Sequence, residues 1–273
     1  MGSNVLIILG MHRSGTSLTA NWLNRCGLNV GDNLEVGNFS NVKGHFEDID
    51  FLELHEALLD ESGLHRWGLY DLRDFPLGSE QKKRVGALVT KKNKLRPQWG
   101  WKEPRTCLFL DPYKELLPEA KYFVVFRDIG SVVSSLMRRD VGLAVAEKEF
   151  RGVFKKIKKN IYIKRLKIEI FNKYKDAYTM AWKIYNNKLY EHLKCLDKNN
   201  YLVFNYEKIF EYDNKIIDYF KRIGFELNYI NFGEIFDSSL ISDIQDDSVF
   251  SDSESSKIDA CFSKLMDESI QRI

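Results

Sequence analysis

The sequence has few cysteines, and their spacing matches neither a metal site nor a disulfide framework. The 273 residues include four, Cys26, Cys107, Cys195 and Cys261, which lie far apart with no CxxC pair. Zinc sites and small disulfide-stabilised domains both need closer and more regular spacings. We therefore expect reduced, mostly buried thiols.

Long apolar runs and a strong net charge are also missing. No apolar run approaches the roughly 18 residues that a membrane-spanning helix needs, and the first ten residues resemble a core strand more than a signal peptide. These absences predict a soluble, cytoplasmic protein. The formal net charge of +2 argues against bulk electrostatic binding to nucleic acid.

Three short apolar runs predict strands that are buried on both faces. They are VLIIL (5–9), YFVVF (122–126) and YLVF (201–204), rich in β-branched and aromatic residues. Helical patterns occupy residues 17–25, 49–59, 107–117, 130–139, 176–196, 208–223 and 254–270. Strands that alternate with helices predict an α/β fold with an open parallel sheet flanked by helices. Such sheets bind ligands at the carboxyl ends of their strands.

Two stretches have a biased charge. Residues 148–175 are crowded with lysine and arginine that alternate with apolar residues, whereas residues 237–259 are acidic and rich in serine. A charged face in contact with solvent is one explanation for each of the two stretches. The basic stretch also fits an amphipathic lid or a wall for an anionic acceptor, and contact with nucleic acid or a membrane stays open. We expect one domain over residues 1–273, with a core of about 4–225, a basic helical insertion or lid at about 140–175 and an acidic C-terminal segment at about 237–273.

The stretch GMHRSGTS (10–17) follows the first predicted strand and begins a predicted helix. A glycine-containing turn at this point directs backbone N–H groups and the helix dipole at one spot, which suits a phosphate. A nucleotide-hydrolysing P-loop would carry lysine where this chain has Thr16, and the cation here is Arg13 instead. The pattern favours a single 5′ phosphoryl group over a nucleoside triphosphate with magnesium. A purely structural turn remains the alternative.

The stretch FRDIGSVVSSLMRR begins with Phe126, at the end of a second predicted strand. Arg127 leaves that strand directly, and Ser135 lies eight residues later on the next predicted helix. The two side chains can converge on one more phosphate, with arginine as a bidentate donor. Taken alone, Arg127 fits a capping residue or a surface ion pair equally well.

These motifs together resemble the sulfotransferases that use 3′-phosphoadenosine 5′-phosphosulfate (PAPS), particularly bacterial members whose first loop reads G-[MV]-x-R-S-G-T-[ST]. The resemblance covers roughly residues 4–225 and includes WGWKEPR (99–105) and VFNYEKIF (203–210). It implies the P-loop-like sulfotransferase fold and a nucleotide held by these residues: Gly10, His12, Arg13, Ser14, Gly15, Thr16 and Ser17 at the 5′-phosphosulfate, Arg127 and Ser135 at the 3′-phosphate, and Tyr206 near the adenine.

The resemblance also implies a reaction. A sulfuryl group would pass from PAPS to an acceptor hydroxyl of a saccharide or glycolipid, leaving adenosine 3′,5′-bisphosphate, without a metal. Arg13 would contact the bridging oxygen, and Lys102 would reach the transferred group or the same oxygen. Peripheral membrane contact through the basic stretch is compatible with this interpretation.

The catalytic base is less certain from the motifs. A histidine that one branch of the family places two residues after the lysine is replaced by Pro104, so a glutamate after the first helix is expected instead. Glu47 is the first choice, with His45 and Glu103 as alternatives. Glu47 or its neighbour Asp48 would equally suit the N-cap of the following helix.

Aromatic residues offer acceptor contacts, and two other functions stay open. Trp67 and the WGW segment (99–101) can stack on a sugar or aryl acceptor, although large aromatics are more often core residues. A kinase or hydrolase with a degenerate P-loop would need a magnesium ligand, for which Asp128 is the nearest candidate. A non-enzymatic protein that binds anions or polynucleotides through residues 148–175 is the other alternative.

Overall fold

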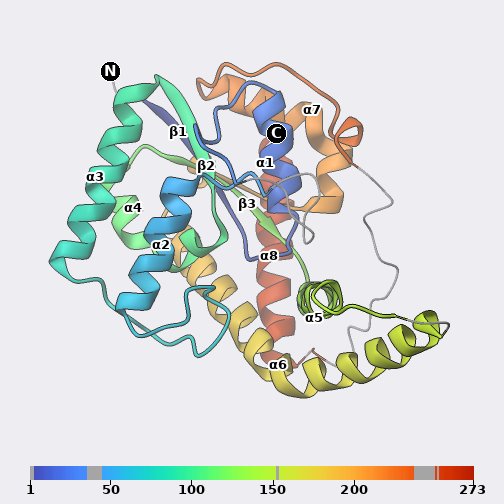
Figure 1. Ribbon diagram of the computed structural model, residues 1–273. Helices are drawn as coiled ribbons and strands as arrows, with labels where there is room; N and C mark the ends of the chain where they lie inside the picture. Colours follow the sequence, from blue (N-terminus) through green and yellow to red (C-terminus); the bar gives the residue numbers. More distant parts are fainter. Residues whose placement is uncertain (1–2, 36–44, 152–153, 237–249, 251) are drawn as a thin grey trace.

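A four-stranded parallel sheet organises the chain. The structure is a computed structural model that describes residues 3–35, 45–151, 154–236, 250 and 252–273 (Figure 1). The strands, in chain order, are β1 (Asn4–Leu9), β2 (Gln98–Lys102), β3 (Lys121–Phe126) and β4 (Tyr201–Asn205). Their spatial order is β2-β1-β3-β4, and every pair is parallel. The fold class expected from the sequence, an open parallel sheet flanked by helices, is confirmed.

This strand order has a consequence for ligand binding. The chain leaves β1 toward β2 on one side and later returns to place β3 on the other side. The order therefore reverses between β1 and β3, and a crevice opens outside the carboxyl ends of strands at such a point. The loop after β1 and the residues after β3 both lie there.

Helices cover both faces of the sheet because the strand side chains alternate between two apolar cores. Ile7, Trp101 and Val124 point into one core, and Leu6 and Phe123 point into the other. Figure 1 shows α1 and α7 on one side and α2, α3 and α4 on the other. The helices are α1 (Thr16–Arg25), α2 (Ile49–Glu61), α3 (Ser79–Leu95), α4 (Leu110–Leu116), α5 (Ile129–Ala146), α6 (Lys155–Lys194), α7 (Tyr206–Arg222) and α8 (Ser253–Arg272), with short 3₁₀ helices η1 (Pro104–Leu108), η2 (Lys198–Asn200) and η3 (Phe232–Glu234).

Polar N-caps start three helices close to the carboxyl edge of the sheet. The side chains of Asp48, Asp128 and Asn205 accept hydrogen bonds from backbone N–H groups in the first turns of α2, α5 and α7. Asp128 and Asn205 stand directly at the ends of β3 and β4. The caps therefore make each chain turn abrupt and fix where the residues after the strands point.

Helix α8 covers the open edge of β4. Ser269 Oγ accepts a hydrogen bond of 3.0 Å from the backbone N–H of Val203, and Arg272 donates to the carbonyl of Tyr201 at 2.9 Å. An uncovered edge strand would present unpaired backbone groups. The side chains of α8 satisfy these groups, so the sheet ends at β4.

Several elements differ from the sequence-based expectation. Helix α6 begins at Lys155, so the basic stretch from that residue onward continues into the helix expected at 176–196. The helix expected at 107–117 is split, because Phe109 leaves the helical conformation between η1 and α4. Strand β2 and helix α3 were not expected, since one is short with a central glycine and the other is dominated by charged residues.

Two further expectations concerned buried thiols and membrane-spanning helices. All four thiols are free, but only Cys26 and Cys107 are buried, while Cys195 is exposed and Cys261 is partly exposed. The expectation of mostly buried thiols was therefore wrong for half of them. Within the described ranges, none of the helices combines the length and apolarity needed to cross a bilayer.

Candidate functional site

The loop between β1 and α1 needs glycine at two positions. Gly10 has φ of 152°, and a Cβ there would lie 2.2 Å from the carbonyl oxygen of Val125 in β3. Gly15 has φ of 95°, and a Cβ there would lie 2.8 Å from the Cβ of Tyr206. Helix α1 then begins at Thr16 without a side-chain cap. Its first N–H groups lack intrahelical acceptors and face the carboxyl edge, as a phosphate-binding loop requires.

Arg13 turns from this loop toward α5. Its Nε donates a hydrogen bond of 3.0 Å to the Oγ of Ser135, a buried residue on that helix. Its backbone has φ of 69°, in the left-handed region that non-glycine residues seldom adopt. The structure therefore brings Arg13 and Ser135, assigned from sequence to opposite ends of the expected nucleotide, into direct contact.

Arg127 lies beside the same loop. Its Nη1 approaches the backbone carbonyl of Arg13 at 3.4 Å, and its guanidinium lies over the ring of Tyr206 at 5.1 Å from the centroid. Within the described part of the chain, no carboxylate lies within ion-pair distance of Arg127. The surface ion pair that the sequence left open for this residue is therefore not observed among those residues.

The surroundings of the loop are strongly positive. Burial, and then the charges of Arg139, Arg127 and Arg138, lower the pKa of Arg13 to about 10. Four arginines thus lie close together at this loop, with Arg139 also paired to Asp140, and such a concentration of positive charge favours the arrival of an anion. Asp128, the magnesium ligand considered for a kinase, instead accepts a hydrogen bond from the N–H of Ser131 as the N-cap of α5.

Glu47 and Lys102 form a buried ion pair. The two atoms, Lys102 Nζ and Glu47 Oε1, lie 2.6 Å apart, and the residues are 1% and 6% exposed. Lys102 is the last residue of β2, at the carboxyl edge. Burial raises the pKa of Glu47, while the Lys102 ammonium opposes this shift. The expected base and the expected lysine thus contact each other, although 54 intervening residues separate them in sequence.

Backbone pairing holds Glu47 in place. The N–H of Glu35 donates to the carbonyl of Glu47 at 2.8 Å, and the N–H of Ile49 donates to the carbonyl of Asn33 at 2.9 Å. An antiparallel bridge joins Leu34 to Asp48 between these two bonds. Residues 36–44 lie outside the described residues, and the described residues on either side of them, Glu35 and His45, lie beside the site.

Glu47 and Asp48 have different roles in the structure. The Asp48 side chain accepts from the N–H of Asp50 as the N-cap of α2 and pairs with Lys92. Glu47 points the other way, to Lys102. The alternative that Glu47 merely caps the helix is therefore wrong, and Asp48 fills that role.

His45 lies next to the same pair. Its Nδ1 is 3.9 Å from a Glu35 carboxylate oxygen, and ligand atoms of Glu35, His45 and Glu47 all lie within 4.8 Å of one another. Burial, and then Lys102, Arg13 and Arg139, lower the pKa of His45 to about 4, so the ring is neutral at pH 7. The three donors match a metal set in type. However, the Lys102 ammonium already occupies an oxygen of Glu47, which disfavours a cation.

A second buried network lies directly behind β2. Glu103 receives hydrogen bonds from Arg105 and from His55, whose other ring nitrogen lies 2.7 Å from the Tyr113 hydroxyl. Burial alone would raise the pKa of Glu103, but Arg105 and then His55 lower it to about 2. A carboxylate that is fully engaged and so acidic makes a poor base, which corrects the alternative that named Glu103. The sequence patterns did not indicate His55 or Arg105, because their partners come from distant segments.

Two polar atoms near the loop lack partners within the part of the chain that the structure describes. His12 Nε2 and the Tyr185 hydroxyl are buried and have no hydrogen-bond partner in the described residues, and their rings meet edge to face with centroids 6.0 Å apart. Burial, followed by Arg105, lowers the pKa of His12 well below its usual value, so it is neutral. The hydrogen-bonding capacity of these two atoms is therefore unused within the described residues.

The aromatic residues divide into a surface group and a core group. Trp67 is 41% exposed, and the guanidinium of Arg139 lies 5.5 Å from its ring centroid. Trp99 and Trp101 are buried, and Trp101 stacks on Phe51 with centroids 4.4 Å apart. The WGW segment belongs to the core, so its proposed contact with an acceptor is wrong, whereas Trp67 stays a candidate.

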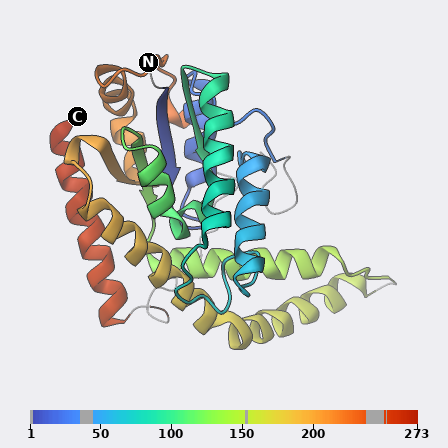
Figure 2. The same ribbon diagram turned by 90° about the vertical axis from the view of Figure 1, so that its left-hand side faces the viewer.

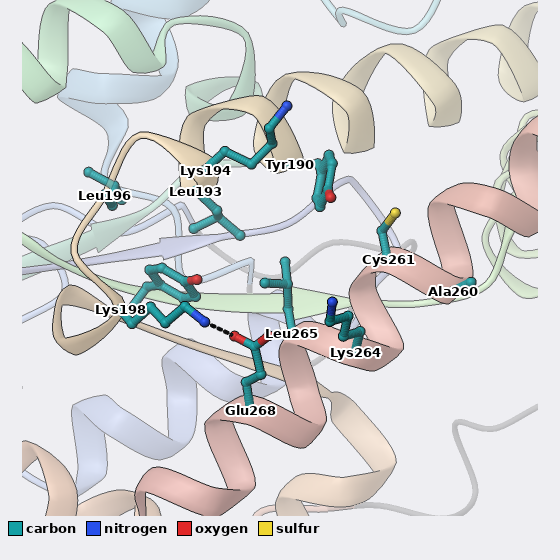
Figure 3. A pocket seen from close by; sticks show the side chains of 11 residues that line it. Tyr190, Leu193, Lys194, Leu196, Lys198, Ala260, Cys261, Lys264, Leu265 and Glu268 are labelled. Carbon is teal, nitrogen blue, oxygen red and sulfur yellow. Dashed lines mark ion pairs between the residues drawn. The ribbon is translucent and has the colours of Figure 1, made fainter.

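A groove of about 540 Å³ lies elsewhere, between the end of α6 and α8 (Figure 3). Lys198 and Glu268 pair across it at 2.8 Å, and Tyr201, the first residue of β4, is part of its lining. The groove is therefore at the amino end of β4, away from the carboxyl edge. None of the site residues expected from the sequence lines it.

Comparisons with known proteins give similarities of fold. No protein-family model matches the chain, and no curated protein sequence matches it. The solved sulfotransferase domain from the curacin biosynthetic pathway is 15% identical, with a TM-score of 0.47 over 96% of this chain and 98% of that one. The sulfotransferase domain of the Synechococcus PCC 7002 olefin synthase is also 15% identical, with a TM-score of 0.48 over 97% and 94%. The chain is thus similar to sulfotransferase domains along nearly its whole length.

Proposed function

We propose that this protein is a PAPS-dependent sulfotransferase that transfers a sulfuryl group to an acceptor hydroxyl of a saccharide or glycolipid. One observation carries the proposal: two separate positions whose donors suit an anion lie close together at the switch point of the sheet. One is the N-terminus of α1 with its loop, and the other is Arg127, which has no carboxylate partner among the described residues. A nucleotide with phosphates at both its 5′ and 3′ positions needs two such positions.

The residues present suit such a nucleotide. The open N–H groups at Gly15, Thr16 and Ser17 provide donors for a 5′-phosphate. Arg127, as a planar fork of donors, provides a site for a 3′-phosphate. The ring of Tyr206 lies between Gly15 and Arg127 and offers an apolar surface for a base or ribose. These assignments are proposals that follow the motifs and the geometry of the loop.

The proposed chemistry places charge where the protein has cations. PAPS supplies the sulfuryl group, and the bond to its 5′-phosphate breaks as a bond to the acceptor oxygen forms. Arg13 and Lys102 stabilise the negative charge on the leaving phosphate and on the transferred group. Donors that are fixed before the reaction stabilise the transition state more than the ground state, and losing one costs about 3 to 4 kcal/mol.

Glu47 accepts the proton of the acceptor hydroxyl in this scheme. The carboxylate is buried beside Lys102, and its raised pKa makes it a better proton acceptor than a free glutamate. Lys102 fixes one oxygen and leaves the other for the acceptor. His45, neutral and close by, is the alternative base. Trp67 and Arg139 would form the outer wall of the acceptor site.

Calorimetric titration tests the nucleotide preference. The protein should bind adenosine 3′,5′-bisphosphate more tightly than AMP or ATP, and magnesium should not be needed. Arg127→Ala should weaken bisphosphate binding by about 10- to 100-fold, the value of one or two charged hydrogen bonds, and should barely change AMP binding. Arg25→Ala, an exposed arginine at the far end of α1, is the control.

Two outcomes would overturn the proposal. One is that the titration detects no binding of adenosine 3′,5′-bisphosphate, AMP or ATP. The other is magnesium-dependent turnover of ATP, which would point to a kinase or hydrolase. If the bisphosphate binds, PAPS consumption measured against saccharides, glycolipids, phenols and peptides then identifies the acceptor class.

A further inference from the structure

The outer half of α6 projects from the body of the protein together with α5. The two helices run side by side away from the sheet (Figure 2). Residues of α6 that pack toward α5 form a small separate core: Tyr162, Ile163, Leu166, Ile170 and Tyr174. At 100° per residue, these five positions fall within about 120° of the helix circumference. This face accounts for the ordinary amphipathic packing of the helix.

A second apolar row lies on the opposite side of the same helix. Phe154, at the helix N-cap, is 63% exposed, and Ile157, Ile161 and Ile168 are 57%, 63% and 64% exposed. The same geometry places all four within about 60°, centred about 180° from the face that packs on α5. A solvated helix face would carry polar residues there. Four large apolar residues aligned on a projecting helix indicate a surface that binds something.

The charge around this row is concentrated. From Phe154 to Lys175 the chain has nine lysines and arginines and one glutamate, a net charge of +8. Since the whole protein has a net charge of +2, the rest of the chain has −6. Lys158 and Lys164 lie on either side of the apolar row by the same helical geometry. Both are exposed and have no described ion pair.

We propose that this face of α6, the row Phe154, Ile157, Ile161 and Ile168 with its flanking lysines, binds the surface of an anionic membrane. Apolar side chains that enter the boundary between headgroups and acyl chains, flanked by lysines that meet anionic headgroups, are the physical requirements for a helix lying in that interface. A second copy of the chain is disfavoured because two such segments, each with a net charge of +8, would repel each other. A polynucleotide would use the charge but would leave the isoleucines in water.

The site lies at the base of this projection. Trp182, on the inner half of α6, donates a hydrogen bond of 3.0 Å to the backbone carbonyl of Arg127. Arg139 on α5 lies beside Trp67. Binding through α6 would therefore hold the site close to a membrane, where a glycolipid acceptor resides. This last step rests on the proposed function, whereas membrane binding itself does not.

Vesicle co-sedimentation tests the proposal with the full chain. We expect binding to vesicles of phosphatidylcholine mixed with phosphatidylglycerol, and much weaker binding to phosphatidylcholine alone. Lys158→Gln/Lys164→Gln should lower the partition coefficient about fivefold for each charge removed. Ile157→Ser/Ile161→Ser should lower it at least tenfold with all the charges retained.

Matched controls lie on other helices. Lys82→Gln/Lys94→Gln removes two exposed lysines from α3, and Leu95→Ser/Leu116→Ser removes two exposed leucines. Both controls should bind vesicles like the unaltered protein. Every variant should keep its affinity for adenosine 3′,5′-bisphosphate, which also shows that it is folded.

Three results would overturn the membrane proposal. The first is no binding to anionic vesicles at low salt, and the second is binding that the isoleucine substitutions leave unchanged. The third is tight binding to RNA or DNA, or concentration-dependent dimerisation, that depends on this face in the absence of vesicle binding. Failure of bisphosphate binding with vesicle binding intact would count against the proposed function alone.

Discussion

Arg13 Nε and Ser135 Oγ are joined by a hydrogen bond of 3.0 Å that connects the loop after β1 to helix α5. Because Arg13 has a left-handed backbone conformation, its side chain is directed by this bond and by the loop together. Ser135 thus positions the cation of the loop that we propose to bind the 5′-phosphate, in addition to any contact with a 3′-phosphate.

Removing that hydroxyl should therefore loosen Arg13. Ser135→Ala is expected to weaken bisphosphate binding by about tenfold, the value of one hydrogen bond, with little loss of thermal stability. Ser134→Ala, one residue earlier on the same helix, is the control for calorimetry. Unchanged affinity in Ser135→Ala would show that Arg13 is held by other contacts.

Gly15 should not tolerate a side chain. Gly15→Ala would place a Cβ 2.8 Å from Tyr206 Cβ in a left-handed backbone conformation, so we expect a destabilisation of about 1 to 3 kcal/mol and loss of nucleotide binding. Gly86→Ala tests the opposite case. Gly86 lies inside α3, and a Cβ there would lie 3.6 Å from Leu116 Cδ2, its nearest neighbour. Alanine at this position should therefore stabilise the protein by about 0.5 to 1 kcal/mol. Denaturant unfolding measures both changes, and equal effects of the two would contradict this account.

Substitution of Glu47 should impair catalysis, whereas substitution of its neighbour Asp48 should lower stability. Glu47→Gln is expected to reduce kcat by roughly 10² to 10⁴ while bisphosphate binding persists, because the amide cannot take a proton. Asp48→Asn keeps an acceptor at the N-cap but removes the charge that pairs with buried Lys92, so it should lower the free energy of unfolding by about 1 to 3 kcal/mol and leave kcat unchanged. Normal turnover in Glu47→Gln would transfer the role of base to His45.

The pH dependence of stability should reflect the buried histidines. Because the pKa of His45 is about 4 in the folded protein and about 6.5 when unfolded, the unfolded chain binds the extra proton first as the pH falls. The stabilisation is therefore complete above pH 6.5 and is lost between pH 6.5 and 4. His45→Gln should reduce this loss by on the order of 1 kcal/mol, allowing for solvent screening.

His192 provides a comparison far from the loop. Burial lowers its pKa to about 4 as well, so His192→Gln should also flatten the curve of unfolding free energy against pH. The two substitutions should act additively because the residues share no described contact. Unfolding curves that keep the same pH dependence in both variants would contradict the pKa assignments.

Local sequence patterns predicted the strands that have continuous apolar runs. β1, β3 and β4 are such runs, and each is buried on both faces. β2 escaped prediction because Gly100 interrupts it and its two tryptophans resemble a surface binding segment. Only pairing with β1 makes it a strand. The full length of α6 escaped prediction for a similar reason, because its basic outer half buries apolar side chains by packing against α5.

The sequence predicted the position of those site residues that lie just after a strand. The loop glycines and Arg127 directly follow strands, so the sequence places them at the carboxyl edge. The ion pair of Glu47 with Lys102, by contrast, depends on how the segment after α1 pairs back on itself. The network of His55, Glu103 and Tyr113 joins three separate segments of the chain, and no spacing within one segment encodes it.

Helix α6 has 40 residues, so it measures about 60 Å along its axis. Its inner half is fixed by Tyr178, Trp182 and Tyr185 in the main core, while its outer half packs on α5 and reaches Phe250 through Phe171 and Tyr70 through Tyr174. A continuous helix resists a sharp bend, because a kink interrupts its backbone hydrogen bonds. Movement of the exposed end is therefore expected to reach Trp182, whose indole N–H donates a hydrogen bond to the backbone carbonyl of Arg127.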